Sequence, residues 1–162
     1  MLDPQKAKAA SRLLVSHWDH GTHLDAIPEE LRPKTRTEGY AIQAHVMDRS
    51  AVPLFGWKIA ATSLAGQRHI NVDGPMAGRL LAEKAVAVGG TVSLATSKMR
   101  VAEIEFAFRF GRQIPPRPAP YEIAEVIDAV ATLHPAIEIP DSRYDDFRAV
   151  GAPQLIADNA CA

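Results

Sequence analysis

The chain has 162 residues, of which 47% are hydrophobic and 23% are charged. This length and composition are typical of one globular domain with a buried core, so they exclude a wholly disordered chain. The 19 acidic and 18 basic residues leave a formal net charge of -1. That balance excludes the strong basic field with which proteins attract nucleic acid or anionic lipid.

The sequence also lacks the usual signals of membrane and secreted proteins. No run reaches the roughly 20 apolar residues that a transmembrane helix needs, and the first residues contain no apolar signal-peptide core. A single cysteine, Cys161, excludes an internal disulfide and a cysteine zinc cage. We therefore expect a soluble, cytoplasmic protein with neither nucleic-acid nor membrane partners.

The first half of the chain predicts two helices and one strand. A helix is expected over residues 4–18, with Asp3 as its N-cap and a proline in its first turn. A second helix is expected over residues 37–49, where apolar residues recur at helical spacing. A strand follows over residues 54–61, and residues 67–81 predict a structured loop because they are rich in turn residues.

The second half of the chain predicts the clearest strand. Residues 101–110 alternate an apolar face with a face that carries charge. A helix is expected over residues 121–133, ended by the histidine and proline that come next. A short strand over residues 136–139 and a last helical turn over residues 153–159 complete the pattern.

Helices that precede a set of strands favour an α+β fold over a regular α/β alternation. We expect residues 1–52 to form an N-terminal helical region and residues 53–162 to form a β-rich catalytic region. The two regions together are expected to make a single domain.

Three glutamates interrupt apolar patterns and are the main candidate site. Glu103 and Glu105 lie on one face of their strand, at most about 7 Å apart at Cα. Glu138 lies between two isoleucines. Three acids without a nearby histidine or cysteine suit a hard cation with oxygen ligands, namely Mg²⁺ or Mn²⁺. The alternative is a solvated sheet face, with Glu138 paired to Arg143.

Two further residues are candidates with an open role. Lys58 lies within a strand-like segment, where an ammonium group either meets an anion or protects a sheet edge from further pairing. Cys161 by itself indicates a small buried hydrophobe rather than a nucleophile, because no base accompanies it at a fixed spacing.

Five segments, in this order, resemble one known family. The segments are GWKIAATS at 56–63, DGPMAGRL at 73–80, AEIEFAF at 102–108, PAIEIPDSR at 135–143 and IADNA at 156–160. Together they resemble the 2-keto-4-pentenoate hydratase and 4-oxalocrotonate decarboxylase family, within the fumarylacetoacetate hydrolase superfamily. The resemblance covers nearly the whole chain. It implies the first part of a fumarylacetoacetate hydrolase-like mixed β-roll after the N-terminal helices.

The resemblance also implies roles for individual residues. Glu103, Glu105 and Glu138 match the family's ligands to one divalent metal ion, Mg²⁺ or Mn²⁺. Lys58 matches the family's active-site lysine, which implies a catalytic and substrate-binding role.

The sequence departs from the family in two positions of the expected site. Met76 stands where family members often carry an acidic residue, so we expect Asp73, three residues earlier, to be the candidate substitute. Cys161 stands where related sequences often have a serine. A substrate contact through the backbone N–H of Cys161 would survive that change, whereas a hydroxyl contact would not.

Family members also continue beyond the Asp-Asn-Ala segment, with strands that complete the β-roll. We therefore expect this chain to be an incomplete β-roll, truncated at its C-terminal end, with strand edges and apolar surface exposed.

The implied activity is that of a metal-dependent hydratase, a lyase of aromatic catabolism. It would add water to 2-hydroxypenta-2,4-dienoate or a close relative and give a 4-hydroxy-2-oxo acid. One alternative is decarboxylation of a 2-oxo-dienedioate on the same metal site, and hydrolysis of an acylpyruvate is a weaker one. Another alternative is a non-catalytic remnant or partner subunit. We expect a small-molecule substrate and a homo-oligomer.

Overall fold

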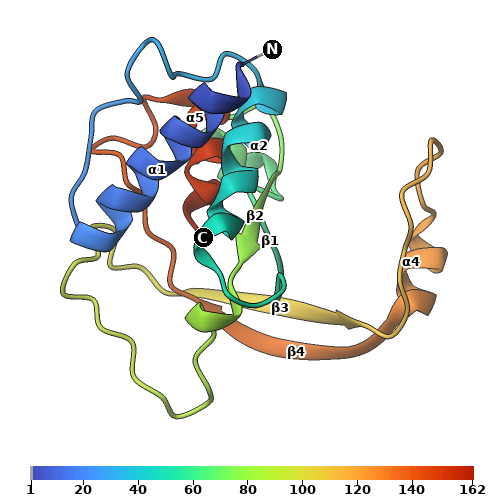
Figure 1. Ribbon diagram of the computed structural model, residues 1–162. Helices are drawn as coiled ribbons and strands as arrows, with labels where there is room; N and C mark the ends of the chain where they lie inside the picture. Colours follow the sequence, from blue (N-terminus) through green and yellow to red (C-terminus); the bar gives the residue numbers. More distant parts are fainter. Residues whose placement is uncertain (1) are drawn as a thin grey trace. The chain divides into compact units, whose positions relative to one another are not determined.

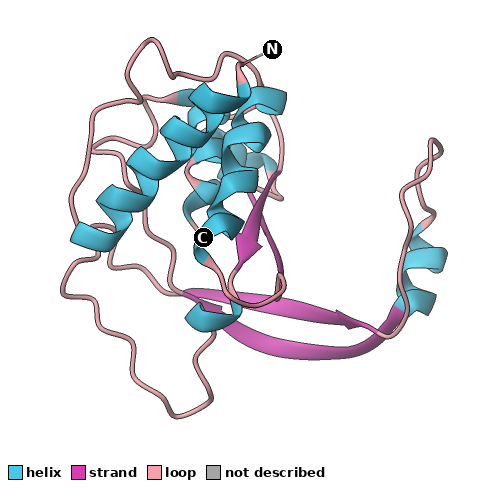
Figure 2. Ribbon diagram, in the orientation of Figure 1, coloured by secondary structure: helices cyan, strands magenta, loops and turns pink. Residues whose placement is uncertain are grey.

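The structure is a computed structural model that describes residues 2–162. The chain forms two compact units. The first unit contains the residues up to Arg100 together with Pro140–Ala162, and the second contains Val101–Ile139. Both units are drawn in Figure 1, and their helices and strands are distinguished in Figure 2.

Three helices form the core of the first unit. They are α1 (Pro4–His20), α2 (Arg36–Ala44) and α5 (Gly151–Ala157), and α2 packs against both others. Gly39 permits the close approach of α2 to α5, since a Cβ at Gly39 would lie 2.4 Å from the carbonyl oxygen of Pro153. The side chains of Ile42 and Ile156 are fully buried at this contact, and each such burial contributes about 1.5–3 kcal/mol.

Helix capping follows the sequence closely. The carboxylate of Asp3 accepts hydrogen bonds from the backbone N–H groups of the next turn, which confirms it as the N-cap of α1. Gly21 ends this helix at a left-handed φ of 63°. The hydroxyl of Thr35 accepts from Glu38 N and caps α2. The second helix is shorter than predicted, because residues His45–Arg49 continue it as a separate 3-10 helix.

A two-stranded antiparallel sheet completes the first unit. Strand β1 (Gly56–Ala60) pairs with β2 (Met76–Leu80), so that Lys58 lies opposite Gly78. The loop predicted over residues 67–81 is therefore wrong at its end, where β2 forms. A short helix, α3 (Leu64–His69), connects the strands. A second short 3-10 helix covers Ala82–Lys84.

The second unit is a β-hairpin with a helix inserted between its strands. Strand β3 (Glu103–Phe110) pairs antiparallel with β4 (Val130–Glu138), and α4 (Ile123–Ala129) leads directly into β4. The helix predicted over residues 121–133 is thus too long. Pairing with β3 outweighs the local helical pattern after Ala129. Pro135 lies within β4 instead of ending a helix, which a strand at a sheet edge permits.

The observed elements confirm an α+β fold. Among the described residues, no helix is both long enough and apolar enough to cross a membrane. The predicted boundary between residues 52 and 53 stays a prediction. So does the expectation that the two regions make a single domain.

Candidate functional site

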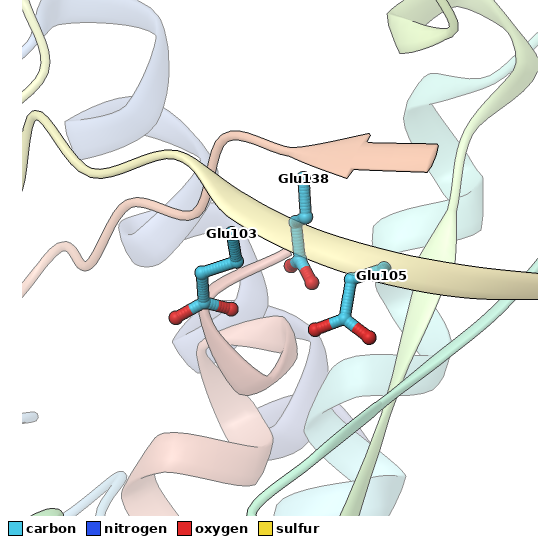
Figure 3. A group of neighbouring side chains, drawn as sticks. All are labelled: Glu103, Glu105 and Glu138. Atoms are coloured by element: carbon cyan, nitrogen blue, oxygen red, sulfur yellow. The ribbon is translucent and has the colours of Figure 1, made fainter. Parts of the chain in front are cut away.

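The three predicted metal ligands lie together on one face of the β3–β4 hairpin. Glu103 and Glu138 are direct partners in the antiparallel register, and direct partners project from the same face of a sheet. Glu105 lies two residues further along β3 and therefore shares that face. One carboxylate oxygen from each residue lies within 4.8 Å of the others. Figure 3 shows the three carboxylate groups side by side.

The electrostatics of this carboxylate cluster favour a cation. Glu103 and Glu105 are exposed and Glu138 is half-buried. Like charges placed directly opposite each other in a sheet are destabilising, and a divalent ion would reverse that repulsion. The donor set consists only of carboxylate oxygens, which suits Mg²⁺, Mn²⁺ or Ca²⁺ better than a metal that prefers nitrogen or sulfur. The residues present therefore fit a hard divalent ion.

Arg143 forms a buried ion pair within the first unit. The guanidinium of Arg143, which is almost fully buried, forms an ion pair with the carboxylate of Asp158 and also donates to the Asp158 carbonyl oxygen.

Lys58 lies in β1 and reaches a turn formed by the last residues of the chain. Its Nζ donates to the carbonyl oxygen of Ala160 at 2.9 Å. The side chain is half-buried on the face of β1 that it shares with Gly56 and Ala60. The ammonium group is thus directed by a backbone carbonyl that lies 102 positions away in the sequence.

That turn has an uncommon conformation. Asn159, Ala160 and Cys161 have positive φ angles of 56°, 53° and 65°. Glycine and, to a lesser degree, asparagine tolerate such angles, whereas alanine and cysteine adopt them at a cost. The side chain of Asn159 accepts from Arg79 N at 2.7 Å and donates to Arg79 O at 2.8 Å, so it attaches the turn to β2. We call residues Asn159–Cys161 the left-handed turn.

Cys161 is held in this turn mainly by its backbone. Its N–H donates to the Asp158 carbonyl oxygen at 3.1 Å, and its own carbonyl accepts from Asp141 N at 3.0 Å. Burial, reinforced by the carboxylate of Asp158, raises the pKa of the Cys161 thiol to about 12. The thiol is therefore protonated at neutral pH, and its lack of a nucleophilic role stays a prediction. A substrate contact through its N–H would compete with Asp158.

Asp73 lies in the turn before β2. Its carboxylate forms an ion pair with Arg36 and its side chain is 78% exposed. A shallow cavity of about 390 Å³ adjoins it, lined also by Lys34, Thr35, Asn71 and residues at the start of α5. Met76, the neighbour that replaces the family's acidic residue, is buried in the core. The catalytic role of Asp73 and the substrate-binding roles of Lys58 and Cys161 stay predictions.

Asp158 was not identified from the sequence, although this residue supports the left-handed turn. Its carboxylate accepts from Ser142 Oγ at 3.2 Å and from Arg143 N at 3.0 Å, in addition to the guanidinium. The available signal was the IADNA segment at 156–160, which contains Asp158.

Curated sequences and solved structures include relatives of this chain. No protein-family model matches the sequence. A curated "4-oxalocrotonate decarboxylase" from Pseudomonas sp. is 36% identical over 117 residues, which is 72% of this chain and 44% of the relative. A curated "2-keto-4-pentenoate hydratase 1" from Dechloromonas aromatica (strain RCB) is 31% identical over 157 residues, which is 94% of this chain and 58% of the relative.

A solved structure shares the fold. It is a 4-oxalocrotonate decarboxylase from Pseudomonas putida G7 complexed with magnesium and adipate, with a TM-score of 0.85 at 21% identity. The match covers 100% of this chain and 62% of that protein. The same enzyme complexed with calcium and acetate matches with a TM-score of 0.83. The chain thus spans between 44% and 62% of the length of these relatives.

Proposed function

This chain belongs to the 2-keto-4-pentenoate hydratase and 4-oxalocrotonate decarboxylase family, and from that premise we propose that it is a divalent-metal-dependent hydratase. Its substrate would be 2-hydroxypenta-2,4-dienoate or a close relative from aromatic catabolism. The observation that carries the proposal is the convergence of Glu103, Glu105 and Glu138 within 4.8 Å.

The carboxylate cluster would hold Mg²⁺ or Mn²⁺. The neighbouring structures, solved with magnesium and with calcium, support a hard divalent ion in this fold. When bound, the ion would supply Lewis acidity that stabilises negative charge on the 2-oxygen of the substrate. The protein's part is to present three oxygen ligands from two paired strands, whose register fixes their spacing.

The proposed reaction moves protons at defined atoms. The enol proton leaves the 2-oxygen and a proton adds to C5, which converts the dienol to an enone. A hydroxyl group from water then adds to C4 and a proton adds to C3, giving the 4-hydroxy-2-oxo acid. By family resemblance, Lys58 would neutralise the substrate carboxylate or relay one of these protons, and Asp73 is the candidate acid. The bond from Lys58 Nζ to Ala160 supports this role, because it gives the ammonium group a defined direction.

Decarboxylation of a 2-oxo-dienedioate is the second candidate. The relative that is 36% identical and both solved neighbours are named 4-oxalocrotonate decarboxylases. The same stabilisation of charge on the 2-oxygen would serve the loss of CO₂. We also propose that residues 53–162 form the first part of a fumarylacetoacetate hydrolase-like mixed β-roll.

An ultraviolet assay of substrate loss tests these proposals. The purified chain is incubated with the dienoate or the 2-oxo-dienedioate, with Mg²⁺ or with EDTA, and the products are identified. We expect Mg²⁺-dependent hydration that EDTA abolishes. Release of CO₂ would favour the decarboxylase. An inert chain that binds a full-length relative would instead support a non-catalytic partner subunit.

A further inference from the structure

Beneath the left-handed turn lies a buried ion pair that no part of the proposed reaction uses. Asp158 and Arg143 are 2% and 4% exposed. Two nitrogen atoms of the guanidinium and the backbone N–H of Arg143 all donate to Asp158. An ion pair removed from water carries a large desolvation cost, so it is weak evidence for a purely stabilising role.

The bonds of Asp158 converge on the residues that form the turn. Its carbonyl oxygen accepts from Cys161 N at 3.1 Å, and from the Arg143 guanidinium. Its carboxylate is fixed by Ser142 Oγ and by Arg143. Asp158 thus connects Ser142 and Arg143 to the left-handed turn.

The turn needs such support because its backbone is unfavourable. Its three consecutive left-handed residues include no glycine, and a left-handed conformation costs free energy for each L-residue with a Cβ. Such conformations persist only where surrounding contacts over-determine them, and they cluster at functional sites. Asp158 and Arg143 supply these contacts on one side of the turn, and Asn159 supplies them on the β2 side.

This arrangement fixes the direction of the Ala160 carbonyl, whose oxygen accepts a hydrogen bond from the ammonium group of Lys58. A rotation of the turn toward ordinary backbone angles would re-aim this carbonyl. The chain of contacts therefore runs from the buried ion pair, through the turn, to the ammonium group.

We propose that Arg143 and Asp158 are positioning residues that hold the ammonium of Lys58 in place through the left-handed turn. The functional consequence of this proposal rests on the proposed function, in which Lys58 meets the substrate. The positioning itself concerns only the contacts within the first unit.

The test removes both charges together, so that no buried charge is left without its counterion. In the double variant Arg143→Met/Asp158→Asn, methionine retains an aliphatic stem and asparagine retains the shape of Asp158. The asparagine oxygen can still accept from Ser142 Oγ and from the backbone N–H of residue 143, whereas both contacts of the guanidinium with Asp158 are lost. Replacement of a buried ion pair by uncharged residues is often neutral for stability, so we expect this variant to fold.

The chain offers a control that is matched in chemistry, although its ion pair is more exposed than the one tested. Arg49 lies over the ring of Trp18 at 4.7 Å, as Arg143 does at 4.8 Å, and Arg49 also forms an ion pair, with Asp19. The variant Arg49→Met/Asp19→Asn therefore removes the same chemical groups from the same ring, without touching the turn.

The measurement is the acetylation rate of Lys58 by limiting acetic anhydride, read by peptide mass spectrometry against the exposed Lys6 of the same molecule. We expect the rate at Lys58 to rise about fivefold in the Arg143 and Asp158 variant, which is the factor for losing one ordinary hydrogen bond. The control should change it by less than about twofold. An unchanged Lys58 rate in the folded double variant would overturn the proposal.

Two additions keep the outcome decisive. If the double variant does not fold, Arg143→Lys keeps the charge and loses the two-pronged contact with Asp158. It should still raise the Lys58 rate, and an unchanged rate again overturns the proposal.

In the turnover assay, the double variant should lower kcat/KM at least about tenfold, while the control leaves it unchanged. If the wild-type chain turns over neither substrate, the proposed function fails, and the acetylation comparison still decides the positioning role.

Discussion

At the residue scale, each of the three glutamates is unfavourable in its own strand. Glutamate has a poor strand propensity, and Glu103 faces Glu138 directly across the ladder. A cation at the centre would convert repulsion between the carboxylates into attraction. The loss of any one ligand should therefore weaken binding strongly.

We predict that Glu105→Gln weakens the binding of Mn²⁺ more than about tenfold, because an uncharged amide replaces one of three anionic ligands. Isothermal calorimetry on the purified protein measures the affinity. Glu122→Gln is the control, since Glu122 is an exposed acid of the same unit outside the carboxylate cluster. Equal affinities for wild type and Glu105→Gln would remove Glu105 from the ligand set.

A second prediction at this scale concerns Lys58→Met. Methionine keeps the aliphatic stem and loses the bond to Ala160, so the stability should fall by only about 0.5–1.5 kcal/mol. Turnover of the dienoate should fall at least about 100-fold, the lower range for a positioned acid–base or charge-stabilising group.

Turnover and thermal unfolding of Lys58→Met are compared with those of Lys6→Met, which changes an exposed lysine of α1. Near-normal turnover would exclude Lys58 from the reaction. Aggregation at unchanged turnover would instead support the alternative that Lys58 protects a sheet edge.

At the element scale, the left-handed turn packs against β2 through a glycine. A Cβ at Gly78 would lie 2.3 Å from the carbonyl oxygen of Asn159 and 3.0 Å from Cγ of Lys58. Backbone atoms approach so closely here that any side chain would force the turn away from β2.

We therefore predict that Gly78→Ala destabilises the protein by about 1–3 kcal/mol, the usual range for overpacking. Gly56→Ala is the matched control in the paired strand, because its Cβ would meet only Leu80 Cδ1 at 3.8 Å. Urea unfolding measures both. Equal stabilities of the two variants would show that β2 and the turn are less closely packed than described.

The loop before α4 carries an acid-sensitive contact. The guanidinium of Arg117 donates to both carboxylate oxygens of Glu125, and Glu122 N donates to the same carboxylate at 2.8 Å. The hydrogen bonds from Arg117, followed by that from Glu122, lower the pKa of Glu125 from 4.5 to about 2.

A carboxyl group with a lowered pKa stabilises the folded state above its unfolded pKa, and this contribution is lost as the pH falls toward the folded value. The first turn of α4 should therefore loosen between pH 4.5 and about 2. Carboxyl NMR should give a Glu125 midpoint near 2. In Arg117→Gln the midpoint should rise, and a wild-type midpoint at the ordinary value would contradict the contact.

At the scale of the whole molecule, the second unit exposes a continuous apolar face. Ile104 and Phe106 are 89% and 71% exposed, and their cross-strand partners are Ile137 and Pro135. An isolated two-stranded hairpin is marginally stable in water, and apolar patches of this kind commonly mark association sites. The homo-oligomer expected from the sequence stays a prediction, and this face is the surface that we expect it to use.

We predict that the protein self-associates through this face. The double variant Phe106→Thr/Phe108→Thr keeps residues with high strand propensity and removes two large apolar groups. It should shift the sedimentation profile toward the monomer, whereas Arg109→Thr, on the opposite face of β3, should not. A wild-type protein that sediments as a single monomer would contradict the prediction.

Local features could be predicted from the sequence because their causes are local. The N-cap at Asp3, the end of α1 at Gly21 and the alternation along β3 depend on residues within one or two turns or strand repeats. The three candidate oxygen ligands and the candidate lysine were likewise identified from residue type and family resemblance. Strand β2 and the early end of α4 were not predicted, because both depend on pairing with a distant strand.

The sequence by itself determined which side chains carry charge, where α1 begins and ends, and which face of β3 is apolar. Only the tertiary structure decided that Glu138 lies opposite Glu103, that Lys58 bonds to Ala160, and that Asp158 is buried with Arg143. These contacts join residues between 15 and 102 positions apart. Periodicity and propensity act over a few residues, whereas strand register and the burial of an ion pair depend on how the whole chain packs.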